Sequence, residues 1–350
     1  NYKFNDPFKF VKMQSLFFFV GIILMYILSN LDYHIFKKYS NIILFGCLLL
    51  LVLVLIPGIG TVRNGSRSWF GIGSLGIQPS EFAKSILVIF MAIYYNRLNL
   101  KKVKNIYAYF VPLSFAAIVI GLVFMQPDLG SAAIIAGIVF LTFISIPVVQ
   151  NNIMKFIKIF SVVVILLVIG FLYSGNDFLS SIQKGRLNFK NPCSRYTETT
   201  GYQVCNGFIA INNGGLFGVG LGNSTQKYLY LPESHTDFIF PIIVEELGLV
   251  TGIIIILGYA YILSRILKIA KTSENLRCSI LAYGTFWYFT LHILVNLLGV
   301  LALIPLTGVP LPFLSYGGSF TVNAIIMIFV VERVNIENKI NKTKREIKAL

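Results

Sequence analysis

The sequence predicts an all-α, polytopic membrane protein, and its composition is the first reason. Hydrophobic residues make up 56% of the 350 residues and charged residues 12%, against about 25% charged residues in soluble domains. The mean hydropathy is +0.77. The second reason is that polar residues gather in loops between long apolar runs, as they do when much of the surface faces lipid. We therefore treat residues 1–350 as one integral-membrane domain.

Nine apolar runs are expected to form membrane helices. They are residues 13–31, 41–56, 80–95, 110–125, 131–146, 159–173, 238–263, 279–304 and 320–331. The last run is short, but Glu332 and Arg333 can carry its polar end into the interface. The hydrophilic segment at about 174–237 is expected to be a large extracellular loop, and about 333–350 a tail.

The distribution of basic residues predicts the orientation. Eighteen lysines and arginines fall on the side of the C-terminal tail, and six fall in short segments on the other side. Since basic residues are enriched on the cytoplasmic side, the tail is expected to be cytoplasmic. With nine helices the first residue then lies outside, so we expect a further helix to precede this chain. The net charge of +15 fits contact with anionic membrane lipid rather than nucleic acid.

Residues 228–248 concentrate charge at the edge of an apolar run. The ionisable side chains there are Glu233, His235, Asp237, Glu245 and Glu246. Charges at the edge of a membrane helix are costly unless they have a function. Asp237 directly precedes the run at 238–263 and is our candidate catalytic residue. The alternative is that Asp237 or Thr236 caps the N-terminus of that helix.

The segment 58–84 carries three basic residues, Arg63, Arg67 and Lys84. One interpretation is an outward-facing basic rim that binds an anionic head group, because arginine can bind phosphate through two parallel hydrogen bonds. The other is an interfacial anchor at Trp69 with a local ion pair between Glu81 and Lys84, which are three residues apart.

Three further outer segments contain candidate residues. Asp128 either caps the helix that begins near residue 131 or binds a cation. Lys227 either contacts an anionic substrate or extends toward the interface, while the glycines at 211–223 indicate tight turns. The connection 304–320 contains three prolines and three glycines, so it is expected to be re-entrant and packed over a cavity. Ser315 and Tyr316 are its candidate hydrogen-bond donors.

Four cysteines divide by their position in the sequence. Cys193 and Cys205 lie together in the outer loop, where conditions are oxidising, so a disulfide is expected between them. Cys47 lies within a predicted helix and Cys278 beside a cytoplasmic loop, so both are expected to be free.

The outer segments together resemble a known family. NGSRSW, QPSEFAK, QPDLGS, NNGGLFGVGLGNSTQKYLYLPESHTDFIF, EELG and PLPFLSYGGS are similar, in this order, to the motifs of the shape, elongation, division and sporulation (SEDS) family. The resemblance implies a ten-helix bundle, with its first helix missing here. The implied activity is that of a peptidoglycan glycosyltransferase, which polymerises lipid II on the outer face of the bacterial cytoplasmic membrane with a class B penicillin-binding transpeptidase as partner.

The family's catalytic aspartate falls on Asp237, and its recurring basic positions fall on Arg67, Lys84 and Lys227. We expect these basic residues, with Arg63, Glu233, His235 and Ser315, to bind substrate. The family pattern does not include the Cys193 and Cys205 pair.

The chemistry can also be argued from the residues. One carboxylate suffices as the base for an acceptor hydroxyl, and the pyrophosphate leaving group needs positive charge more than a proton. That charge can come from the basic residues or from a divalent cation such as Mg²⁺ or Mn²⁺; no other cofactor is expected. Single displacement predicts inversion at the anomeric carbon. Two alternatives remain, a lipid II flippase or other transporter and a non-enzymatic scaffold of the cell-wall synthesis machinery.

Overall fold

The computed structural model describes residues 8–30, 33–63, 65–72, 75–102, 105–146, 185, 188–228 and 230–349. Within these residues the fold is mostly helical. Its α-helices are α1 (Lys9–Asn30), α2 (Tyr33–Leu53), α3 (Pro79–Leu100), α4 (Val111–Met125), α5 (Leu129–Ile144), α9 (Thr199–Gly214), α10 (Ile239–Thr272), α11 (Leu276–Val300) and α12 (Gly318–Ala349). Two short 3-10 helices, η1 (Ile106–Phe110) and η2 (Pro192–Arg195), join them.

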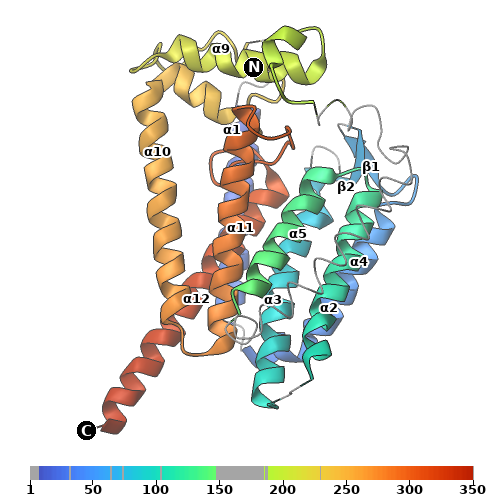
Figure 1. The fold of residues 1–350 in the computed structure, drawn as a ribbon, viewed down its shortest axis with the longest axis vertical. Helices are drawn as coiled ribbons and strands as arrows, with labels where there is room; N and C mark the ends of the chain where they lie inside the picture. The colour runs from blue at the N-terminus through green and yellow to red at the C-terminus, as the bar shows by residue number, and fades with distance from the viewer. Residues whose placement is uncertain are drawn as a thin grey trace.

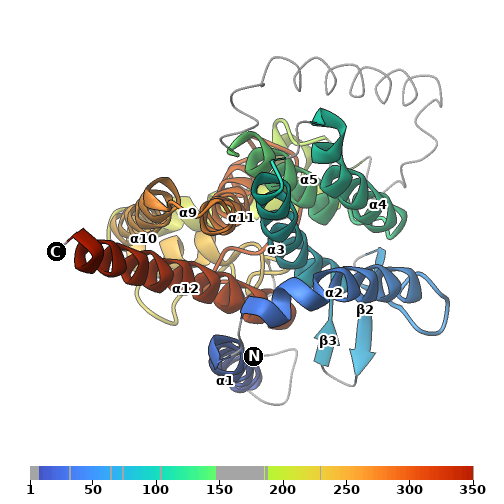
Figure 2. The same ribbon diagram turned by 90° about the horizontal axis from the view of Figure 1, so that it is seen from below.

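Most of the helices stand side by side, and α9 lies across one end of the bundle (Figure 1). We call this end, which also carries the strands and the start of α10, the α9 end. Helix α3 is central, since it packs against α2, α4, α5, α11 and α12. Helix α1 lies at the periphery beside α12, as the view along the bundle shows (Figure 2).

Eight of the nine expected spans fall on helices, namely α1 to α5 and α10 to α12. The ninth, residues 159–173, lies outside the described residues. Among the described residues, five helical segments are long and apolar enough to cross a membrane. They are Lys9–Leu28, Tyr107–Met125, Ile239–Thr272, Leu276–Val300 and Gly318–Lys348, while Leu129–Ile144 is apolar but shorter. The chain is thus a multi-pass membrane protein.

One expected boundary was wrong, and one helix was not expected. Helix α12 does not end near residue 331 but continues to Ala349, so the expected tail is helical. The sequence after residue 331 contains no glycine or proline, and its Glu, Lys and Arg residues are strong helix formers. The segment expected to be a large loop, at about 174–237, also contains a helix that we did not predict, α9.

A small sheet is the exception to the all-α fold. Strands β1 (Thr61–Arg63), β2 (Ser66–Ile72) and β3 (Leu75–Ile77) form an antiparallel meander at the α9 end. Gly65 follows β1 with a φ of +81°, a conformation that glycine adopts without strain. The sequence signal was the Asn-Gly pair at 64–65, which is typical of tight hairpin turns.

The surface of the bundle is apolar where lipid would lie. Large apolar side chains are exposed along the peripheral helices, including Phe19 of α1, Ile42 of α2 and Ile254 of α10. The interior contains two clusters of buried apolar side chains, one around α2 to α5 and another around α5, α10, α11 and α12. Exposed apolar faces of this extent fit helices surrounded by lipid.

Helix α10 is broken at Gly248, which has a φ of +85° and a ψ of 165°. Backbone groups on both sides of the break pair with the segment that follows α9. Leu249 N–H donates to Gly215 O at 2.9 Å, and Val219 N–H donates to Glu245 O at 2.9 Å. Two more such bonds join Val250 to Leu216 and Gly220 to Glu246. The short arm of α10 before Gly248 and the α9 segment are therefore fastened together.

Candidate functional site

Asp237 lies at the end of an irregular segment, one residue before the N-cap of α10. Residues 232–238 form consecutive turns, and the helix begins at Ile239. The N-cap residue is Phe238, and within the described residues no side-chain hydrogen bond caps this helix end. The capping interpretation of Asp237 and Thr236 is therefore wrong. The Asp237 side chain is nevertheless held in a mostly buried position, since the residue is 9% exposed.

The Asp237 carboxylate lies beside Thr236 and Gly308. The Thr236 hydroxyl is 3.0 Å from Asp237 Oδ1 and 2.8 Å from Glu233 Oε2, so it can donate to either carboxylate. On the other side, a Cβ added to Gly308 would lie 3.6 Å from Asp237 Oδ2. The structure therefore brings Glu233 to Asp237 and places the carboxylate against the connection between α11 and α12.

His235 packs among aromatic rings. Its ring centroid lies 4.2 Å from that of Phe10 and 5.8 Å from that of Tyr316. Burial raises the pKa of Tyr316, and the positive charge of Arg63 acts in the opposite direction. The charge of Arg63 thus acts on Tyr316, whose ring is a neighbour of the His235 ring.

Ser315 does not reach the surface as we expected of a substrate contact. It is 1% exposed. Its hydroxyl donates to Thr236 O at 2.6 Å and accepts from Leu311 N–H at 2.7 Å. Both of these bonds lie within the chain, so Ser315 is a hydrogen-bond donor to the Asp237 segment. That matches its expected chemistry but not its expected partner.

The basic residues are placed in different surroundings. Arg63 is exposed and lies over the Trp69 ring at 5.1 Å. Arg67 is half-buried on β2, opposite Val62 of β1. Lys227 forms an ion pair with Glu246. Of the four candidate basic residues, Arg63 and Arg67 have no ion pair within the described part of the chain.

Lys84 is the clearest correction, because it is 2% exposed and is not part of an outward-facing rim. It forms the expected ion pair with Glu81 at 2.7 Å, and its Nζ lies 3.0 Å from His292 Nε2. His292 in turn contacts Tyr288 O through Nδ1 at 2.7 Å. Lys84 lies on the face of α3 that packs against α11. Glu81 and His292 therefore take the place of water around its charge. The sequence analysis missed His292, although a histidine within an apolar run is a visible signal.

Glu245 has a structural role that the sequence did not reveal. The residue is 1% exposed, and its carboxylate accepts from Asn213 Nδ2, Ser224 Oγ, Thr225 N–H, Thr225 Oγ1 and Gln226 N–H. We call these groups the Glu245 cluster. It ties the loop after α9 to the arm of α10.

Asp128 caps α5, as one of the two interpretations proposed. Its Oδ1 accepts from Ser131 N–H at 3.0 Å, and its Oδ2 accepts from Gln78 Nε2 at 2.9 Å. Both carboxylate oxygens therefore have partners within the chain.

The cysteines occupy the expected states. Cys193 and Cys205 are joined in a disulfide that connects η2 to α9. Cys47 and Cys278 are free and buried.

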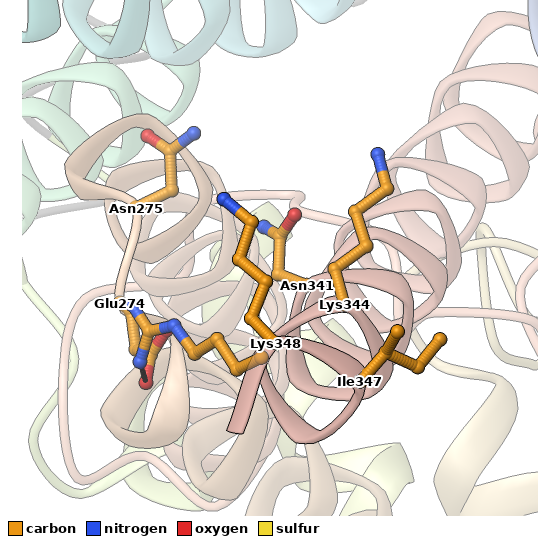
Figure 3. A pocket seen from close by; sticks show the side chains of 7 residues that line it. Glu274, Asn275, Asn341, Lys344, Ile347 and Lys348 are labelled. Atoms are coloured by element: carbon orange, nitrogen blue, oxygen red, sulfur yellow. Dashed lines mark hydrogen bonds and ion pairs between the residues drawn. The ribbon is translucent and has the colours of Figure 1, made fainter. Parts of the chain in front are cut away.

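Two cavities lie at the opposite end of the bundle from Asp237. The larger, of about 550 Å³, lies between the α10 to α11 turn and the end of α12 (Figure 3). Lys344 and Lys348 line it, and Arg345 pairs with Glu274 at its edge. The smaller, of about 140 Å³, is lined by Arg277, Glu337 and apolar residues. Neither cavity contains a residue that the sequence analysis placed at the site.

The chain is similar to several known proteins. The family model described as "Cell cycle protein", of the FtsW, RodA and SpoVE type, matches residues 1–340. Stage V sporulation protein E of Bacillus subtilis is 38% identical over 341 residues, covering 96% of this chain and 89% of that protein. The probable peptidoglycan glycosyltransferase FtsW of Legionella pneumophila is 35% identical over 340 residues, covering 96% and 84%.

Solved structures share the fold. The rod shape determining protein RodA of Thermus thermophilus superposes with a TM-score of 0.63 at 26% identity, covering 95% of this chain and 89% of that one. A chain from a structure described as "Structural coordination of polymerization and crosslinking by a peptidoglycan synthase complex" superposes with a TM-score of 0.74 at 26% identity, covering 95% and 91%.

Proposed function

Because the chain belongs to the FtsW, RodA and SpoVE family of cell cycle proteins, we propose that it is a peptidoglycan glycosyltransferase that polymerises lipid II, with Asp237 as the catalytic base. Relatives that match over almost the whole chain bear the name peptidoglycan glycosyltransferase. The observation that supports Asp237 is its setting, since it is a mostly buried carboxylate at the α9 end that does not cap α10.

The neighbouring carboxylates support the choice of Asp237 by their own contacts. Glu245 is surrounded by donors within the chain, and Glu246 pairs with Lys227. Glu233 shares the Thr236 hydroxyl with Asp237. Glu245 and Glu246 therefore have structural roles that would be lost if they exchanged protons with a substrate.

In the proposed reaction, the Asp237 carboxylate accepts the proton of an acceptor sugar hydroxyl. The hydroxyl oxygen forms a bond with the anomeric carbon of the donor lipid, and the bond from that carbon to the pyrophosphate oxygen breaks. The pyrophosphate leaves with the bonding electron pair, and the configuration at the carbon inverts. A positioned base of this kind contributes a factor of about 10² to 10⁴ in rate.

Positive charge near the leaving group would stabilise the pyrophosphate. Arg63 and Arg67 are the best candidates, because the charge of Lys227 is already offset by Glu246. Glu233 and Asp237 are oxygen donors of the kind that Mg²⁺ and Mn²⁺ prefer. Within the described residues, however, no three His, Cys, Asp or Glu side chains gather to hold a metal. No step of the proposed reaction is therefore routed through a metal.

The proposed setting is the bacterial cytoplasmic membrane, with the C-terminal end of α12 in the cytoplasm and the α9 end facing outward. The excess of basic residues at the end opposite α9 supports this orientation. A class B penicillin-binding transpeptidase is the proposed partner, since a chain of similar fold occurs in a peptidoglycan synthase complex. Its membrane helix would pack on the lipid-facing side of α10 and α11, where apolar side chains such as Ile254 and Leu257 are exposed.

The test is polymerisation of lipid II by purified Asp237→Asn protein with its partner. Asn keeps the shape of Asp but cannot accept the proton, so we expect a fall in kcat of about 100-fold or more with normal insertion and partner binding. Glu198→Gln is the matched control, because it neutralises a half-exposed carboxylate beside α9 that is not proposed to react. Polymerisation by Asp237→Asn at close to the parent rate would refute the assignment.

A further inference from the structure

Three consecutive carbonyls, those of His235, Thr236 and Asp237, each accept a hydrogen bond from a different kind of donor. The backbone N–H of Tyr316 donates to His235 O at 2.8 Å. The Ser315 hydroxyl donates to Thr236 O at 2.6 Å. The Asn296 amide donates to Asp237 O at 2.8 Å. We call this arrangement the three-carbonyl contact.

The three-carbonyl contact restricts the backbone on both sides of Asp237. A peptide unit is planar, so fixing its carbonyl fixes the plane. The Thr236 carbonyl belongs to the plane before the Asp237 Cα, and the Asp237 carbonyl belongs to the plane after it. With both planes held, φ and ψ of Asp237 are set, and so is the direction of its Cα–Cβ bond. The carboxylate then retains only its side-chain torsions.

Asn296 and Ser315 are themselves anchored in the protein interior. Asn296 belongs to α11 and is 3% exposed, and its amide also donates to Val309 O at 2.8 Å. Its Oδ1 has no hydrogen-bond partner among the described residues, so the side chain acts as a double donor. Ser315 is fixed by Leu311 N–H. Both residues therefore join the segment of Asp237 to the connection between α11 and α12.

We propose that Asn296 and Ser315 are positioning residues that hold the Asp237 carboxylate in its reactive direction. The inference rests on the proposed role of Asp237 as the base. Neither residue touches substrate in this proposal, since both side chains are buried and directed at backbone carbonyls of the chain. A displacement of about 1 Å at a reacting group can lower a rate by about 100-fold, so the two residues should affect turnover more than substrate binding.

The first variant to test is Asn296→Leu, whose side chain has the same number and branching of heavy atoms as Asn but donates no hydrogen bond. We expect kcat for lipid II polymerisation to fall on the order of 10- to 100-fold, with KM within about twofold of the parent value. The matched control is Asn206→Leu. Asn206 is also buried at the α9 end, but within the described residues its side-chain hydrogen bonds go to Tyr196 and Tyr202 rather than to the Asp237 segment.

Hydrogen–deuterium exchange distinguishes positioning from general damage to the fold. In Asn296→Leu we expect faster exchange in peptides covering residues 230–238 and 305–317, with exchange in the rest of α11 unchanged. A merely structural role for Asn296 would accelerate exchange along α11 and raise KM together with the fall in kcat, and would thus overturn the proposal.

Ser315→Ala provides a second route should Asn296→Leu fail to fold. It removes only the bond to Thr236 O and the acceptor for Leu311 N–H, and we expect a kcat about 5- to 30-fold below the parent with KM unchanged. Parent-like kcat in Ser315→Ala and in any folded Asn296→Leu, alongside an inactive Asp237→Asn, would refute the positioning role while the proposed function stands. An active Asp237→Asn would instead refute the proposed function.

Discussion

Removing the Glu245 carboxylate should destabilise the α9 end more than any other single carboxylate substitution in that region. In Glu245→Ala, five donor groups of the Glu245 cluster lose their acceptor. Thr225 is exposed, so water can replace the carboxylate for its two groups. Ser224 and Gln226 are buried, and a stranded buried donor costs about 1–3 kcal/mol. Two such donors give an expected loss of about 4 kcal/mol in the free energy of unfolding.

Glu245→Gln should cost about half as much. Gln retains one oxygen, which can turn toward the buried donors Ser224 and Gln226, but it loses the negative charge that strengthens these bonds. We expect a loss of about 1–2 kcal/mol. The parent should therefore be the most stable, Glu245→Gln intermediate and Glu245→Ala the least stable, because each side chain in this order retains fewer acceptors.

The assay is thermal unfolding of detergent-solubilised protein, with hydrogen–deuterium exchange over residues 213–227. At about 2 °C per kcal/mol for a chain of this size, Glu245→Ala should melt roughly 8 °C below the parent. Glu198→Ala is the control, because it removes an ion pair with Arg195 whose Glu198 side chain is 48% exposed, and such pairs contribute at most about 1 kcal/mol. A melting temperature of Glu245→Ala within 2 °C of the parent, with no local gain in exchange, would show that the cluster does not stabilise this region.

Three further outcomes follow from the structure. Lys84→Met strands the buried Glu81 carboxylate and should cost about 3 kcal/mol; the double variant with Glu81→Gln should recover part of the lost melting temperature, and no recovery would argue against the ion pair. Reduction of the disulfide between Cys193 and Cys205, which are 12 positions apart, should cost about 3 kcal/mol and accelerate proteolysis between η2 and α9; an unchanged cleavage rate would contradict this. Gly248→Ala places a Cβ 2.2 Å from a backbone oxygen, so folded protein should be lost from size-exclusion profiles, and a normal profile would contradict the break at this residue.

The spans were predictable because lipid imposes one requirement along each helix, a long apolar run. Eight of the runs proved to be helices, and their predicted ends were wrong where polar helix formers continue the helix, as in α12. The hairpin around Gly65 was missed because its strands are only three to seven residues long. Helix α9 was missed because it does not cross the bundle and its sequence is only weakly apolar.

For the candidate site, the sequence indicated where Asp237 lies along the chain but not the contacts of the residues around it. The sequence placed Asp237 at the edge of a span, and the structure agrees. It could not show that Lys84 points to His292, because that depends on how α3 and α11 face each other. It also could not reveal Asn296, since one amide within an apolar helix has no sequence-local partner and bonds 59 residues away.

The break in α10 has a mechanical consequence. The backbone groups of Leu249 and Val250 would donate to residues four positions earlier if the helix were continuous, but here they donate to Gly215 and Leu216. Straightening α10 would separate all four bonds across the break, and each unpaired group costs several kcal/mol where water is excluded. The short arm of α10 before Gly248 therefore cannot move alone. Any rearrangement at this end must move α9, the segment after it and the first turns of α10 together as one rigid unit. The bend would lie in α10 beyond Gly248.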